Sequence, residues 1–111
     1  MPRPPKPFLD FTRENPAIGR AYEALGTACT EAGPLDARAR ALVKLGLAIG
    51  ARLEGAVHSH ARRAREAGVT VAEIRHVVSL AAPTLGLPAT VAAYTWVREA
   101  LGGTGGRRGR R

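Results

Sequence analysis

Small apolar residues at helical spacing in the middle of the chain constrain its fold more than any other feature. Positions 53, 57, 60, 64 and 67 step alternately by four and three residues, which keeps them on one side of an α-helix. These positions hold Leu53, Val57, His60, Ala64 and Ala67. The spacing predicts a helix over about residues 53–67 with this stripe towards the core, and Gly68 as its C-terminal cap.

Residues typical of helix starts and apolar helical faces recur along the rest of the chain. Asn15-Pro16 is typical of a helix start, and that helix should reach about Glu31. Its apolar face is predicted to hold Ile18, Tyr22, Leu25 and Cys29. Asp36 is expected to cap a second helix that is apolar nearly all round and therefore buried on most sides.

Two further helices follow the central one. Thr70 and Glu73 form a capping box that opens a fourth helix, Pro83 and Gly86 should bend or end it, and Pro88 should start a fifth. Four prolines among the first seven residues predict an irregular segment over residues 1–14. The sequence thus predicts an all-α bundle of about five helices over residues 15–101.

Composition and charge limit the class of protein. A chain of 111 residues is enough for one small domain, and only 5% of it is aromatic. A core of alanine, leucine and valine buries little area per residue, so we expect the chain to form a homo-oligomer. The net charge is +8, and residues 102–111 contain four arginines and no acid. This segment is expected to be a flexible Gly/Arg tail, either merely solvated or in weak contact with nucleic acid.

Other classes are disfavoured by what the sequence lacks. A single cysteine excludes a disulfide within the chain and a cysteine zinc motif. No apolar run reaches the roughly 18 residues of a membrane helix. The proline-rich start has no apolar stretch typical of a secretion signal. We therefore expect a cytoplasmic protein without a membrane partner.

His60 is the first candidate for chemistry. It is either a hydrogen-bonded core histidine or a general acid/base, because imidazole exchanges protons near neutral pH. Glu54 and His58 lie four residues apart, so they share a helical face and can hydrogen-bond. His58 and His60 are about 200° apart on the helical wheel. They cannot both point into one pocket of a single subunit, whereas a pocket between subunits could combine them.

The remaining candidates are weaker. Lys44 is a cation within an apolar helix, and Glu54 is a conceivable partner for it. His76 is expected to be a partly exposed helix residue, and Cys29 a small core residue. The His58-Ser-His60 pattern lacks the i, i+4 spacing of two ligands on one helical face, so no metal site is predicted.

Three stretches of the sequence resemble the carboxymuconolactone decarboxylase family, which includes the alkylhydroperoxidase D-like proteins. They are residues 35–46, 60–74 and 81–88, within a similarity that covers about residues 17–101. The most specific part is the histidine followed by Ala-x-x-Ala-x-x-Ala-Gly-x-Thr-x-x-Glu-Ile, which starts at His60. The resemblance implies an all-α fold and assembly as a trimer or hexamer.

The hydroperoxidase branch of that family uses residues that this chain lacks. Its Cys-x-x-Cys pair falls at Leu53 and Ala56, its proton-relay glutamate at Ala41, and the histidine between its cysteines at Gly55. Thiol peroxidase chemistry needs a thiolate and a resolving thiol, so the peroxiredoxin activity associated with the family is not expected here.

The decarboxylase branch has acidic residues just before the same histidine, and Glu54 stands in that region. We therefore expect a cofactor-free lyase that acts on a small organic acid or lactone. His60 would be the general acid or base, Glu54 and His58 would orient it or relay protons, and Lys44 or Arg52 would hold the substrate carboxylate. The alternatives are a redox protein that works with a partner thiol, and a non-catalytic oligomeric binding protein.

Overall fold

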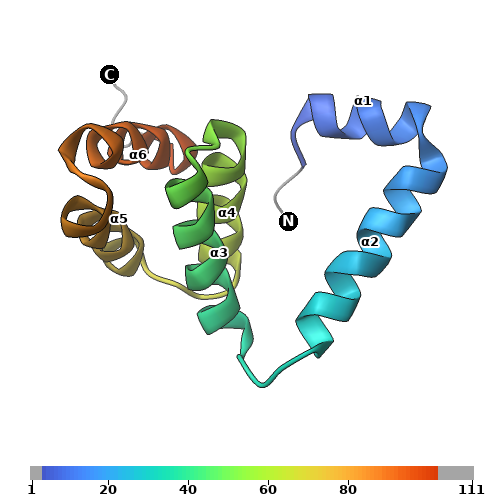
Figure 1. The fold of residues 1–111 in the computed structure, drawn as a ribbon, viewed down its shortest axis with the longest axis horizontal. Coiled ribbons are helices and arrows are strands. Elements are labelled where there is room, and N and C mark those ends of the chain that lie inside the picture. Colours follow the sequence, from blue (N-terminus) through green and yellow to red (C-terminus); the bar gives the residue numbers. More distant parts are fainter. Residues whose placement is uncertain (1–3, 103–111) are drawn as a thin grey trace.

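A computed structural model describes residues 4–102 of the chain. The residues described form helices and no strand, which confirms the all-α prediction. Six helices are present where about five were expected (Figure 1). Their bounds are α1 Lys6–Glu14, α2 Pro16–Glu31, α3 Ala37–Ala51, α4 Glu54–Glu66, α5 Val71–Leu85 and α6 Leu87–Ala100.

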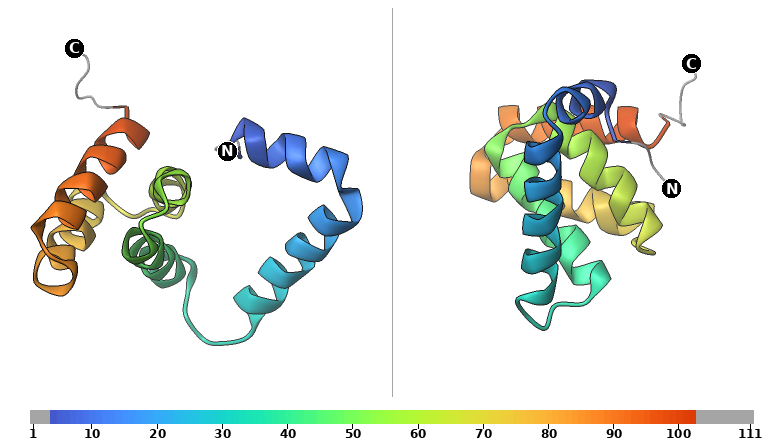
Figure 2. Two further views of the ribbon diagram at one scale, coloured as in Figure 1. Left: turned by 45° about the horizontal axis from the view of Figure 1, so that its top comes forward. Right: turned by 90° about the vertical axis from the view of Figure 1, so that its right-hand side faces the viewer.

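The helices divide into a four-helix core and an N-terminal arm. Helices α3 to α6 pack together, with α4 against both α3 and α6 and with α5 against α3 and α6. Helices α1 and α2 pack on each other and reach away from the core, so that the chain has the outline of an open V (Figures 1 and 2). No residue of α1 or α2 is buried. The arm thus contributes nothing to the hydrophobic core of this chain.

The core is built largely from small and medium-sized side chains. Its fully buried members have no exposed surface and come from the helices and from the α4–α5 turn: Leu45, Val57, Ala61, Ala64, Val69, Ile74 and Ala93. Alanines at the contacts allow the helix axes to approach closely. They also limit the apolar area that a single chain buries, in keeping with the composition.

The predicted caps fix where α3 and α5 begin. The Asp36 carboxylate accepts a hydrogen bond from the Ala39 amide at 2.9 Å. At the start of α5, the Glu73 amide donates to Thr70 Oγ1 at 3.0 Å and the Thr70 amide donates to Glu73 Oε1 at 2.9 Å, which is the predicted capping box. Gly68 has a φ of +90° after the end of α4, a conformation that favours glycine.

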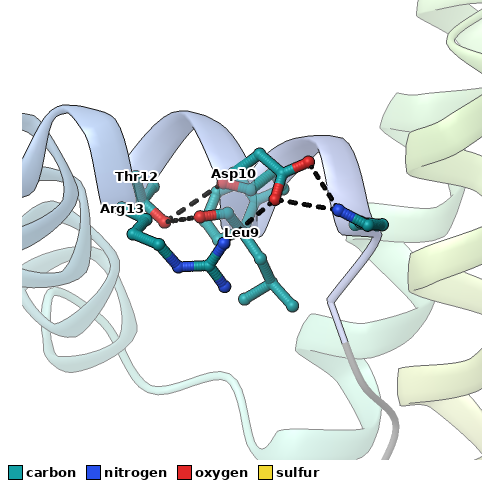
Figure 3. Close-up of polar contacts among 6 residues, drawn as sticks. Leu9, Asp10, Thr12 and Arg13 are labelled. Atoms are coloured by element: carbon teal, nitrogen blue, oxygen red, sulfur yellow. Dashed lines mark hydrogen bonds and ion pairs between the residues drawn. The ribbon is translucent and has the colours of Figure 1, made fainter.

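The expectation of an irregular segment over residues 1–14 is wrong for residues 6–14, which form α1. The prolines do not prevent this helix, because Pro5 precedes it and Pro7 lies in its first turn, where no amide partner is lost. Asp10 pairs with Lys6 at 3.0 Å and with Arg13 at 3.1 Å along one face (Figure 3). These pairs at helical spacing favour the helix. Residues 1–3 lie outside the described part of the chain.

One prediction of burial is also wrong. The predicted apolar face of α2 is exposed, Ile18 by 52%, Tyr22 by 59% and Leu25 by 58%. Cys29 on the same helix is exposed and is not a core residue. The physical reason is that no other helix of the described chain covers α2 apart from its contact with α1.

Helix α3 is buried on fewer sides than its composition predicts. Leu45, Ala48 and Ile49 are buried, whereas Val43 is 49% and Leu47 is 68% exposed. Helices α4 and α5 cover only part of α3, and the rest of its apolar surface is open within one chain. None of the helices described has the length and apolar character that crossing a membrane requires.

Candidate functional site

Helix α4 carries Glu54, His58 and His60, the three predicted catalytic residues, and packs between α3 and α6. Its inward stripe differs slightly from the predicted one. Val57, Ala61 and Ala64 have no exposed surface, while Leu53 is 56% exposed. His60 is half-buried at the edge of this stripe. It is therefore neither a sealed core histidine nor a fully solvated one.

The surroundings of His60 hold its imidazole neutral. Burial lowers the pKa of His60 below its ordinary value of 6.5, and the positive charges of Arg63 and Lys44 lower it further. Lys44 on α3 makes the smallest of these three contributions, and no hydrogen bond in the described structure joins it to His60. Among the described residues, the His60 ring makes no hydrogen bond, and its nitrogens are free to exchange protons with a ligand.

His58 has a different neighbour. Its Nε2 atom lies 3.1 Å from Oε1 of Glu99 on α6, with 26% of the His58 side chain exposed. Glu54 belongs to the same group, since donor atoms of Glu54, His58 and Glu99 all lie within 4.8 Å of one another. The predicted proximity of Glu54 and His58 is thus present, and Glu99 joins them.

The candidate catalytic residues therefore separate within one chain. Glu54 and His58 lie with Glu99 of α6, whereas His60 lies outside that group and its pKa responds to the charges of Arg63 and Lys44. No hydrogen bond or ion pair in the described region links the two groups, as the opposite directions on the helical wheel predicted. Sequence reasoning missed Glu99 because it is 41 residues from His58 and only the packing of α6 on α4 joins them.

Two further predictions concern the turn between α3 and α4. Lys44 has no ion pair with Glu54 in the described structure. Arg52 is exposed and ends α3 in the left-handed conformation, with φ 59° and ψ 42°. Its amide donates to the Ile49 carbonyl oxygen at 3.0 Å. Within residues 4–102 the Arg52 guanidinium makes no polar contact, so its substrate-binding role stays a prediction.

The described residues of the core line two grooves among others on the surface. One, of about 850 Å³, lies between α5 and α6 and includes Arg75, Tyr94 and Arg98. The other, of about 560 Å³, lies between α3 and α5 and includes the exposed His76. Neither groove is lined by His60 or Lys44. A binding pocket around His60 would therefore need surface beyond that of these two grooves.

Comparison with known proteins identifies the family. The carboxymuconolactone decarboxylase family matches residues 16–99, from the first residue of α2 to one residue before the end of α6. The chain belongs to this family, in agreement with the resemblance of the His60–Ile74 segment. Helix α1 lies outside the matched region.

One similar relative is a Haemophilus influenzae protein described as uncharacterized. It is 38% identical over 59 residues, which are 53% of this chain and 52% of the relative. The chain thus spans about half the length of that relative. No solved structure matches the chain. The family is therefore known, while the relative supplies no activity.

Proposed function

We propose that this chain is a lyase of the carboxymuconolactone decarboxylase type in which His60 is the general acid/base. The observation that carries the proposal is the half-buried His60 ring, which has no hydrogen-bond partner in the described chain and whose pKa is lowered by burial and by the charges of Arg63 and Lys44. Its lowered pKa favours the neutral imidazole, which can accept a proton from a substrate at neutral pH and return it to another atom.

In this proposal, the role of Lys44 is to bind the substrate and to stabilise its negative charge. A cation beside the proton acceptor attracts an organic acid and stabilises negative charge that develops on an oxygen when a carbon–hydrogen or carbon–carbon bond breaks. The substrate class that fits best is a small carboxylic acid or a lactone that carries a carboxylate. The proton transfer at His60 needs no cofactor. Glu54 and His58 take part in it only where a second subunit presents them to His60.

Self-association is the second part of the proposal. The stripe formed by Ile18, Tyr22, Leu25 and Cys29 on α2 is left exposed by the described part of the chain. Exposed apolar surface of this kind is typical of a protein–protein interface. A second copy of the chain is the occupant we propose, because the core also leaves apolar side chains open, among them Leu47, Leu87 and Val91. Apolar surface buried between two copies adds to the small apolar area that each chain buries in its own core.

The direct test measures turnover of a panel of small lactone carboxylic acids, with carbon dioxide release as the readout. Replacement of His60 by glutamine should lower turnover by about 10²- to 10⁴-fold, the usual contribution of general acid/base catalysis. His76→Gln is the matched control, since it removes an exposed histidine from α5. Equal turnover by the His60 variant and the native chain would refute the proposal.

A further inference from the structure

A cluster of potential ligands lies on the other side of α4 from His60. Glu54 and His58 are one helical turn apart on α4, and Glu99 comes from the last two turns of α6. Their donor atoms all lie within 4.8 Å of one another. The three side chains thus converge on one point from two helices that pack together.

The charges in this cluster are unbalanced. Two carboxylates stand beside one imidazole, and the described residues provide no lysine or arginine to either carboxylate through an ion pair. Glu54 makes no hydrogen bond or ion pair in the described structure, although the whole chain carries a net charge of +8. Like charges this close repel each other unless a cation lies between them. A bound cation would relieve this repulsion.

We propose that Glu54, His58 and Glu99 bind a divalent transition-metal ion, with Zn²⁺ the best fit. One imidazole nitrogen and two carboxylate oxygens form a donor set suited to zinc, and water would supply a fourth ligand. Two negative charges and a neutral imidazole also balance the charge of the ion. Mg²⁺ is a poorer fit, because it prefers oxygen ligands and keeps several of its waters.

The distances allow such a site with small movements. Ligand atoms about 2.0–2.1 Å from a tetrahedral zinc ion lie about 3.3 Å from one another. His58 Nε2 and Glu99 Oε1 are already 3.1 Å apart. The Glu54 carboxylate lies within 4.8 Å of both other ligand atoms and has to move closer to them, which its exposure permits. The ion would replace the proton that the imidazole shares with Glu99.

The alternative is a site for a proton alone. A protonated His58 between the two carboxylates would form a salt bridge across α4 and α6, and no metal would be needed. The two explanations differ in what they predict for added metal. A proton-only cluster takes up no zinc, whereas a metal site binds one ion per chain and joins the first turn of α4 to α6.

A bound ion would cross-link α4 and α6 through its ligands. These helices also share the core, where Val57 and Ala93 have no exposed surface. A ligand that binds the folded chain and not the unfolded one raises the melting temperature as its concentration rises. Zinc is therefore expected to stabilise the fold independently of proton transfer at His60. This inference does not rest on the proposed lyase activity.

The experiment uses the full, untagged chain after treatment with a chelator. Calorimetric titration with ZnCl₂ should show one strong site per chain, and thermal unfolding should shift upward with added ZnCl₂. Glu54→Gln is the most informative variant, because Glu54 is exposed and makes no hydrogen bond or ion pair in the described structure. It should weaken zinc binding by about tenfold or more, the scale on which a direct ligand matters. His58→Gln and Glu99→Gln should do the same.

Matched controls separate this site from other metal-binding groups. His60→Gln and His76→Gln each remove another histidine and should leave the strong zinc site unchanged. Circular dichroism confirms that each variant is folded. The proposal is overturned if the native chain binds no zinc, if Glu54→Gln binds it as tightly as the native chain, or if a control variant removes the site. Failure of the His60 activity test alone would leave this result unaffected.

Discussion

Arg38 at the start of α3 forms an ion pair with Glu73 at the start of α5, with Nη2 and Oε1 2.5 Å apart. The same carboxylate accepts the Thr70 amide in the capping box, so one side chain joins two helix starts. The Arg38 guanidinium, followed by the Thr70 amide, lowers the pKa of Glu73 to about 2. The ionised carboxylate is thus the form that the folded state favours.

The first prediction concerns stability in acid. Because the folded-state pKa of Glu73 lies below its ordinary value of 4.5, its contribution to stability is present above pH 4.5 and is lost as pH falls towards 2. Glu73→Gln should therefore reduce stability at neutral pH and flatten its decline over this acidic interval. Urea unfolding at several pH values measures this. Glu23→Gln, an exposed acid on α2, is the control and should keep the native slope.

These helix starts were predictable because their signals are local. Thr70, Glu73 and Asp36 lie within three residues of the amides they bond, so the sequence alone indicates where α3 and α5 begin. The partner of Glu73 was not predictable. Arg38 is 35 residues away, and nothing near it in the sequence distinguishes it from Arg40 as an ion-pair partner.

In the candidate site, too, some features were predictable from local sequence and others depend on distant residues. The helical wheel separates His58 from His60, and the structure places them with different helices. The identity of the neighbours, Glu99 for His58 and Lys44 for His60, depends on how three helices pack. The apolar stripe of α2 was also recognisable, but a pattern shows only that a face needs cover. The pattern does not show whether another helix of the same chain or a second copy of the chain provides this cover.

The second prediction tests the cover of α2 by another copy. Replacing Tyr22 and Leu25 together by glutamate places two charges in the exposed stripe and should lower the association constant by tenfold or more, because burial of unpaired charges is costly. Light scattering after size-exclusion chromatography measures the assembly. Arg20→Glu adds a negative charge to the opposite face of α2 and should leave the assembly unchanged. A native chain that stays monomeric at all accessible concentrations would contradict this prediction.

The third prediction concerns the backbone at the α3–α4 turn. Arg52 is the described non-glycine residue with a positive φ. Glycine adopts this conformation without strain, so Arg52→Gly should raise the free energy of unfolding by about 0.5–1 kcal/mol. Arg52→Ala removes the guanidinium but keeps the strain. Denaturant unfolding should therefore show stabilisation for glycine and not for alanine, and equal values for the two variants would contradict the backbone explanation.

The fourth prediction links the charge beside His60 to its reactivity. Burial, Arg63 and Lys44 all lower the pKa of His60, so folding favours the neutral ring. The unfolded chain then binds more protons below pH 6.5, and this contribution to stability is present at higher pH and is lost as pH falls towards the lowered pKa. Lys44→Met removes one of these charges and should raise the pKa of His60 in an NMR titration, but only partly, because burial remains.

The same substitution separates catalysis at His60 from a structural role. If His60 is the general base, the acid limb of the pH–rate profile follows its pKa, and Lys44→Met should move that limb to higher pH. It should also raise KM for a carboxylate substrate, because the cation that attracts it is gone. His76→Gln should alter neither quantity. If the acid limb of the pH–rate profile stays in place while the pKa of His60 measured by NMR rises, a group other than His60 controls the rate.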